Sequence, residues 1–173
     1  ILHTRLNLNR IGMSGHSFGA TTTQIVSGQW KGTGRDGTDP RIKAACAFSP
    51  GMPRFSGTGQ IFGQVEIPWM LMTGTKDISP IGGQDVTSRL AVFPALPPGD
   101  KYELVLYNAE HMAFGDSPRR GHRQARNPNH HRAVIALSTA FWDAYLLDSN
   151  EAKAWLSKNA RTVLENKDRW QKK

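Results

Sequence analysis

Short, continuous apolar runs alternate along this chain with segments whose apolar residues recur at helical spacing. The apolar runs cover residues 10–13, 42–48, 69–73 and 102–107. The helical spacing covers residues 20–30, 85–93 and 133–147. Strands that lack polar alternation are buried on both faces of a sheet. The pattern therefore predicts an α/β fold, with a mostly parallel sheet and helices on both of its faces.

The length of 173 residues suits a single domain with its own core, and no shift in composition divides residues 1–173. The one cysteine, Cys46, lies in an apolar run, which excludes an intrachain disulfide and predicts a buried core residue. No apolar run is long enough for a membrane-spanning helix. Because the chain starts at Ile1, a signal peptide cannot be judged and the compartment stays open. We expect about the last dozen residues, which are polar, to be partly loose.

The formal net charge is +8, and the basic residues gather at two places. One group surrounds a loop rich in glycine, proline and asparagine, and the other ends the chain. They comprise Arg119, Arg120, Arg123, Arg126 and Arg132, and then Lys167, Arg169, Lys172 and Lys173. Neither group has the interleaved aromatic residues of a single-strand binder or a recognition helix. We therefore predict solvated surface charge and no specific binding of nucleic acid.

Residues 15–19 form a G-x-S-x-G pentapeptide between the first apolar run and the first predicted helix. A serine on a sharp strand-to-helix turn needs small residues two positions before and after it, because the backbone there is strained and tightly packed. Gly15 and Gly19 meet that requirement. The alternative is an ordinary glycine-rich turn with a buried serine, since five-residue matches often arise by chance. The strand before and the helix after favour Ser17 as a nucleophile.

Two further chemical groups follow the ends of predicted strands. Functional residues gather at the carboxyl ends of the strands in a parallel sheet. Asp77 comes just after the run 69–73, and His111 comes just after the run 102–107. The order serine, aspartate, histidine is that of the α/β-hydrolase triad. Asp85 and Asp116 are the alternative acids, although Asp85 also suits a helix start.

The chemistry assigns a role to each member of this set. His111 accepts the proton of Ser17 during attack, and Asp77 fixes the imidazole tautomer and stabilises the imidazolium. The backbone N–H of Phe18 is the predicted oxyanion donor, aided by the helix dipole. No metal or organic cofactor is implied, and the adjacent His130 and His131 have no partner at the spacing that metal ligands on a helix need.

Four residues are candidates for the substrate pocket. His16 adjoins the nucleophile and suits a packing or pocket-rim position. Met52, Ile78 and Met112 each lie in a loop that follows a predicted strand. Burial in the core is the more common fate of such side chains.

Five segments of the chain resemble parts of the C-terminal half of serine α/β-hydrolases. The segments are residues 10–20, 72–77 and 109–114, with 139–146 and 152–156 similar to a closing helix and tail. The branch that they resemble holds dienelactone-hydrolase-like and platelet-activating-factor-acetylhydrolase-like enzymes, with similarity to bacterial cutinase-like polyester hydrolases. Dienelactone hydrolases proper use a cysteine nucleophile, so Ser17 favours an esterase-type member. The resemblance implies that four strands and a second oxyanion loop precede residue 1, and that this segment alone aggregates or unfolds easily.

These observations predict a serine hydrolase that cleaves a small or polymeric carboxylic ester through an acyl-enzyme intermediate. A peptidase of the prolyl-oligopeptidase kind is an alternative, because it shares the fold and the triad order; a large substrate-gating domain elsewhere in the gene would favour it. A non-catalytic, hydrolase-like binding module is the other alternative, and loss of a triad residue would have favoured that. The acyl group and the oligomeric state stay open.

Overall fold

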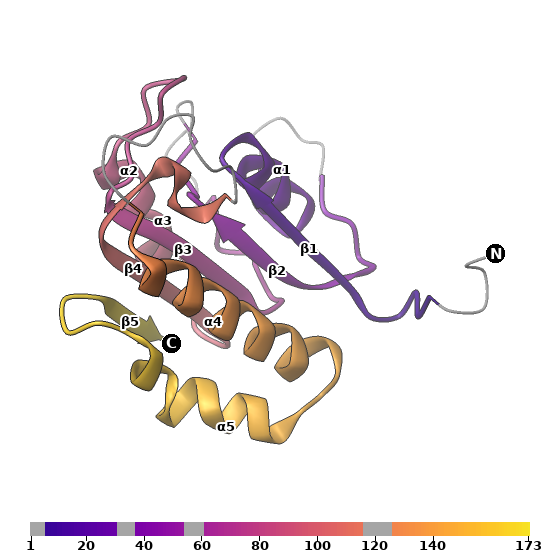
Figure 1. Cartoon of the computed structure of the whole chain (residues 1–173). Coiled ribbons are helices and arrows are strands. Elements are labelled where there is room, and N and C mark those ends of the chain that lie inside the picture. The colour runs from indigo at the N-terminus through magenta and orange to yellow at the C-terminus, as the bar shows by residue number, and fades with distance from the viewer. Residues whose placement is uncertain (1–5, 31–36, 54–60, 116–125) are drawn as a thin grey trace.

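A computed structural model describes residues 6–30, 37–53, 61–115 and 126–173. Its centre is one sheet of five strands in the order β1-β2-β3-β4-β5 (Figure 1). The strands are β1 (Ile11–His16), β2 (Ile42–Phe48), β3 (Trp69–Lys76), β4 (Lys101–Glu110) and β5 (Arg169–Lys172). Strands β1 to β4 run parallel to one another, and β5 is antiparallel to β4. The predicted α/β class is confirmed.

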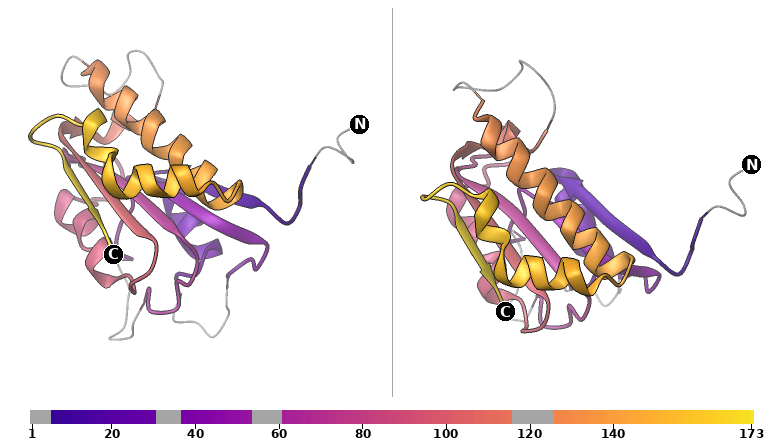
Figure 2. Two further views of the ribbon diagram at one scale, coloured as in Figure 1. Left: turned by 90° about the horizontal axis from the view of Figure 1, so that it is seen from below. Right: turned by 60° about the horizontal axis from the view of Figure 1, so that its bottom comes forward.

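Helices lie on both faces of this sheet (Figures 1 and 2). One face carries α1 (Phe18–Val26), α2 (Val86–Leu90) and α3 (Val92–Ala95). The other carries α4 (Pro128–Leu146) and α5 (Asn150–Lys158). Two 3₁₀ turns, η1 (His111–Phe114) and η2 (Ala160–Val163), complete the elements.

Successive residues of a strand point to opposite faces of the sheet, so alternate residues belong to two separate hydrophobic cores. Met70 and Met72 of β3 pack with α4 and α5, whereas Trp69 and Leu71 pack with α1 and α3. The same alternation divides β2, where Cys46 belongs to the first core. Cys46 is fully buried as predicted, and burial raises the pKa of its thiol. Continuous apolar runs in the sequence therefore correspond to strands covered on both sides.

The helix limits differ from the prediction for local reasons. The segment predicted as one helix over 85–93 is two short helices, and Asp85 caps the first by accepting a hydrogen bond from Ser88 N–H at 2.8 Å. The helix predicted over 133–147 begins earlier, at Pro128, where the Asn127 side chain accepts a hydrogen bond from Asn129 N–H at 2.9 Å. Both cases follow the preference of Asp and Asn for the N-cap position.

The prediction of a loose C-terminus is wrong. Residues 169–172 form β5, and the Trp170 ring stacks on Tyr102 of β4 with 5.5 Å between ring centroids. The backbones of Lys101 and Lys173 exchange hydrogen bonds of 3.0 and 2.9 Å. One aromatic contact and a strand partner therefore outweigh the polar composition. Within the described ranges, no helix is long and apolar enough to cross a membrane.

Candidate active site

Ser17 occupies the turn between β1 and α1. Its backbone has φ 59° and ψ −113°, a left-handed conformation that L-residues rarely adopt. Strain of this kind costs about 1–3 kcal/mol and persists only where the surroundings enforce it. Here the N–H of Ser17 donates to Phe48 O at 3.0 Å, and its carbonyl accepts from Thr21 N–H at 3.1 Å. The end of β2 and the first turn of α1 therefore hold the strained residue from both sides.

The two glycines of the pentapeptide are not equivalent. A Cβ at Gly15 would lie 2.3 Å from the backbone of Gly19, so position 15 admits no side chain. A Cβ at Gly19 would meet nothing within 4 Å. The expectation that both glycines make room for the turn is therefore right for Gly15 and wrong for Gly19. Close approach of the backbone therefore requires glycine at position 15 and not at position 19.

The structure brings Ser17, His111 and Asp77 into one hydrogen-bonded chain. His111 Nε2 lies 2.9 Å from Ser17 Oγ, and His111 Nδ1 lies 2.7 Å from Asp77 Oδ1. Ser17 follows β1, Asp77 follows β3 and His111 follows β4. The parallel strands end at a common edge, which is why residues 94 positions apart in the sequence meet.

The proton positions follow from the chemistry of the partners. A carboxylate accepts hydrogen bonds only, so Nδ1 of neutral His111 carries the proton and donates it to Asp77. Nε2 is then an acceptor and faces the Ser17 hydroxyl. This is the tautomer that can take a proton from serine.

Asp77 is fully buried, and three groups compensate its charge. Thr73 Oγ donates to Oδ2 at 2.9 Å, His111 donates to Oδ1, and Arg89 Nε lies 2.9 Å from Oδ1. An isolated buried carboxylate would be strongly unfavourable. The environment of Asp77 therefore suits an ionised acid that orients a histidine.

His16 packs directly against His111. The two ring centroids lie 4.6 Å apart, and His16 Nε2–H donates to the backbone carbonyl of His111 at 2.9 Å. Burial, and next the proximity of the His111 ring, lower the pKa of His16. His16 therefore packs on His111 with its ring in a setting that favours the uncharged form, which agrees with the expected packing role.

The remaining predicted residues differ in burial and in the element that carries them. Phe18 is the first residue of α1, so its N–H belongs to the helix turn that lacks intrahelical acceptors. Ile78 is exposed, whereas Met112 lies in η1 and is half-buried. Met52 is half-buried and packs on the core beneath α1. Asp116 and most of the first basic group, Arg119, Arg120 and Arg123, lie outside the described residues.

Two site residues escaped the sequence analysis. Thr73 is fully buried inside β3, and Arg89 is fully buried in α2. The sequence contained a signal for Arg89. This residue precedes Val92 and Phe93, which are buried, by three and four residues, so it lies on the same side of the predicted helix as these apolar residues. An arginine on the apolar side of a helix requires a buried partner.

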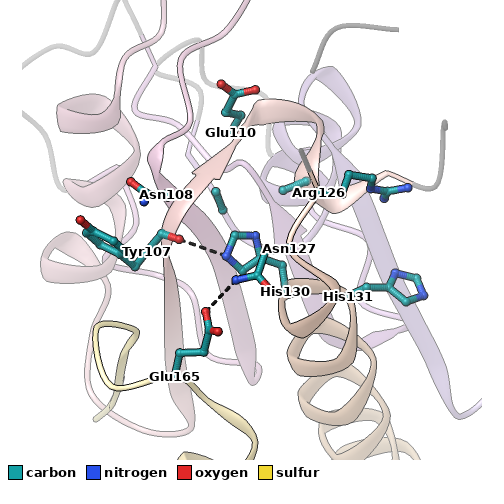
Figure 3. Close-up of a pocket in the computed structure, with 10 residues that line it drawn as sticks. Tyr107, Asn108, Glu110, Arg126, Asn127, His130, His131 and Glu165 are labelled. Atoms are coloured by element: carbon teal, nitrogen blue, oxygen red, sulfur yellow. Dashed lines mark hydrogen bonds between the residues drawn. The ribbon is translucent and has the colours of Figure 1, made fainter. Parts of the chain in front are cut away.

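A separate cavity of about 220 Å³ lies between the end of β4 and the start of α4 (Figure 3). Two pairs of its polar lining groups are hydrogen-bonded to each other. His130 Nε2 donates to Tyr107 O at 3.0 Å, and Asn127 donates to Glu165 at 2.7 Å. Ser17, Asp77 and His111 do not line this cavity, so it is distinct from the candidate site.

A comparison of the chain with models of known protein families matches none of them, and a comparison with curated proteins likewise finds no match. Among the described residues, no group of three or more His, Cys, Asp or Glu side chains could hold a metal ion.

The two glycines allow a matched test of the turn. We expect Gly15→Ala to lower the free energy of unfolding by about 3 kcal/mol, because the new methyl group meets the Gly19 backbone. We expect Gly19→Ala to be neutral or to stabilise by less than about 1 kcal/mol, because alanine favours the helix. Chemical denaturation of both variants measures the difference. Equal effects would contradict the close approach at Gly15.

The lowered pKa of His16 predicts a dependence of stability on pH. Around and below the ordinary value of 6.5, the unfolded chain protonates His16 more fully than the folded protein does. The free energy of unfolding should therefore fall between pH 7.5 and about pH 5.5. His16→Gln should reduce this fall, and His131→Gln, at an exposed position, should leave it unchanged. Denaturation curves at the two pH values measure the slopes, and an unaltered slope in His16→Gln would refute the assignment.

Proposed function

We propose that this protein is a serine hydrolase of the α/β-hydrolase type that cleaves carboxylic esters through an acyl-enzyme intermediate. The observation that carries the proposal is the chain from Ser17 Oγ through the His111 ring to Asp77, with 2.9 and 2.7 Å between the bonded atoms. The strained conformation of Ser17 supports it independently.

In the proposed first step, Ser17 Oγ attacks the ester carbonyl carbon while His111 Nε2 takes the hydroxyl proton. The imidazolium that forms is stabilised by Asp77. The developing oxyanion faces the N–H of Phe18 and the amino end of α1. When the tetrahedral intermediate collapses, the bond to the alcohol oxygen breaks and His111 returns the proton to that oxygen.

In the second step, water attacks the acyl group on Ser17, and His111 takes one proton from the water. Collapse of the second tetrahedral intermediate releases the carboxylic acid, and the proton returns to Ser17 Oγ. No electron acceptor or further reactant is needed. The same three residues thus serve both halves of the cycle.

The proposed branch and the proposed substrate rest on different grounds. The parallel order of β1 to β4 and the position of each triad residue after its strand are consistent with the α/β-hydrolase fold. The preference for esters over peptides rests on the resemblance of the motif segments to esterase-type members.

Hydrolysis of p-nitrophenyl acetate by the full chain tests the proposal. Ser17→Ala and His111→Gln should each lower kcat by about four to six orders of magnitude, and the double variant should be little worse, because the groups act as a unit. Asp77→Asn should cost about four orders, because asparagine favours the wrong tautomer.

Two matched controls accompany these variants. Ser14→Ala changes an exposed serine on the same strand, and His131→Gln changes an exposed histidine at the start of α4. Both should retain the activity of the parent. A Ser17→Ala variant with more than a tenth of the parent activity would refute the proposal, and an inactive but folded parent would favour a non-catalytic binding module.

A further inference from the structure

Arg89 is the most completely buried cation at the candidate site. Its side chain has no exposed surface, and neither has that of Asp77. Arg89 Nε lies 2.9 Å from Asp77 Oδ1 and donates to the Asp77 backbone carbonyl at 2.7 Å. A guanidinium has five donors and no acceptor, so burial is tolerated only where many acceptors converge.

The acceptors come from the ends of neighbouring strands. Nη1 donates to Ser49 O at 2.6 Å and to Pro50 O at 3.0 Å, both just after β2. Nε binds the Asp77 loop after β3, and Nη2 lies 3.2 Å from Nδ1 of His111, just after β4. One planar group therefore contacts the segments that follow three adjacent strands. Because the guanidinium is planar and rigid, its hydrogen bonds fix the positions of these segments relative to one another.

The contact with His111 is electrostatic in kind. Nδ1 donates its proton to Asp77, so it offers no acceptor to Nη2. The positive guanidinium therefore faces a ring that becomes positive when it takes a proton. Like charges at this distance oppose each other strongly in a buried site.

We propose that Arg89 is a positioning residue of the Ser17–His111–Asp77 set, which fixes Asp77 against His111 and whose positive charge opposes the uptake of a second proton by the His111 ring. This proposal rests on the proposed function, because it concerns the readiness of His111 to act as a base. Arg89 is buried behind Asp77 and has no contact with Ser17 in the described structure, so its action is through the other two residues.

The other charged and titratable groups around His111 fit this role. Asp77 favours the imidazolium, and Arg89 offsets that effect. His16, packed on the opposite side of the ring, is held uncharged by its lowered pKa. Glu110 precedes His111 at the end of β4, and Asp85 acts on Arg89 from the exposed start of α2. Arg89 is thus the one fixed positive charge among these groups.

The dependence of ester hydrolysis on pH tests the proposal in the full chain. Arg89→Gln removes the charge but retains an amide donor for Asp77. In a plot of kcat/KM against pH, activity falls on the acidic side as His111 takes up a second proton, and this fall is the acidic limb. We expect the acidic limb of Arg89→Gln to lie about one unit higher in pH than that of the parent. We expect kcat at the plateau to fall by roughly a hundredfold with little change in KM, because the triad is misplaced while the substrate contacts remain.

Arg89→Lys separates charge from position. Lysine keeps the positive charge but cannot bridge three segments at once. We expect this variant to keep the acidic limb of the parent and to lose kcat at the plateau. Lys101→Gln is the matched control, because Lys101 is also buried but lies at the opposite end of β4. It should lower the melting temperature without moving the limb.

The outcomes separate this proposal from the proposed function. An inactive parent would refute the function itself. An active parent with an acidic limb that is the same in Arg89→Gln would overturn only the role of Arg89. Failure of both Arg89 variants to melt cooperatively would also overturn it, in favour of a purely structural role.

Discussion

The buried carboxylate of Asp77 is the group on which the arrangement at the carboxyl edge of the sheet depends. A lone charge at this depth would cost several kcal/mol, and each compensating contact fixes a different part of the chain. Thr73 binds it from within β3, His111 from the end of β4, and Arg89 from α2. Since Arg89 also binds the carbonyls after β2, the need to compensate one carboxylate orders three loops.

The turn at Ser17 adds a second constraint that the sheet supports. Its φ of 59° would relax in a free peptide, but β1 is hydrogen-bonded to β2, and Ser17 N–H bonds to the last residue of β2. The absent side chain of Gly15 lets α1 approach the strand. The strain therefore aims Oγ at His111, and the packing of α1 on the sheet offsets its cost.

Much of this could be predicted because the determining patterns are local. Strands covered on both faces leave continuous apolar runs, so β2 appears at residues 42–48 in the prediction and in the structure. Asp77 and His111 could be chosen as candidates because each comes just after such a run, and the residues that follow parallel strands lie at one edge of the sheet. The pairing of β5 with β4 was not predictable, since its residues are polar and its partner lies more than 60 positions away. The contacts of Arg89 could not be predicted, because they join α2 to the segments that follow β2, β3 and β4, and these four parts of the chain meet only in the fold.

Labelling with a fluorophosphonate, followed by mass spectrometry of the peptides, is the most direct test of Ser17 as an activated nucleophile. The reagent modifies only a serine whose proton can pass to a base. We expect an adduct on Ser17 of the folded full chain, no adduct on Ser14, and loss of labelling in His111→Gln. An unlabelled Ser17 in protein that melts cooperatively would contradict an activated nucleophile, and labelling that persists in His111→Gln would contradict the role of that histidine.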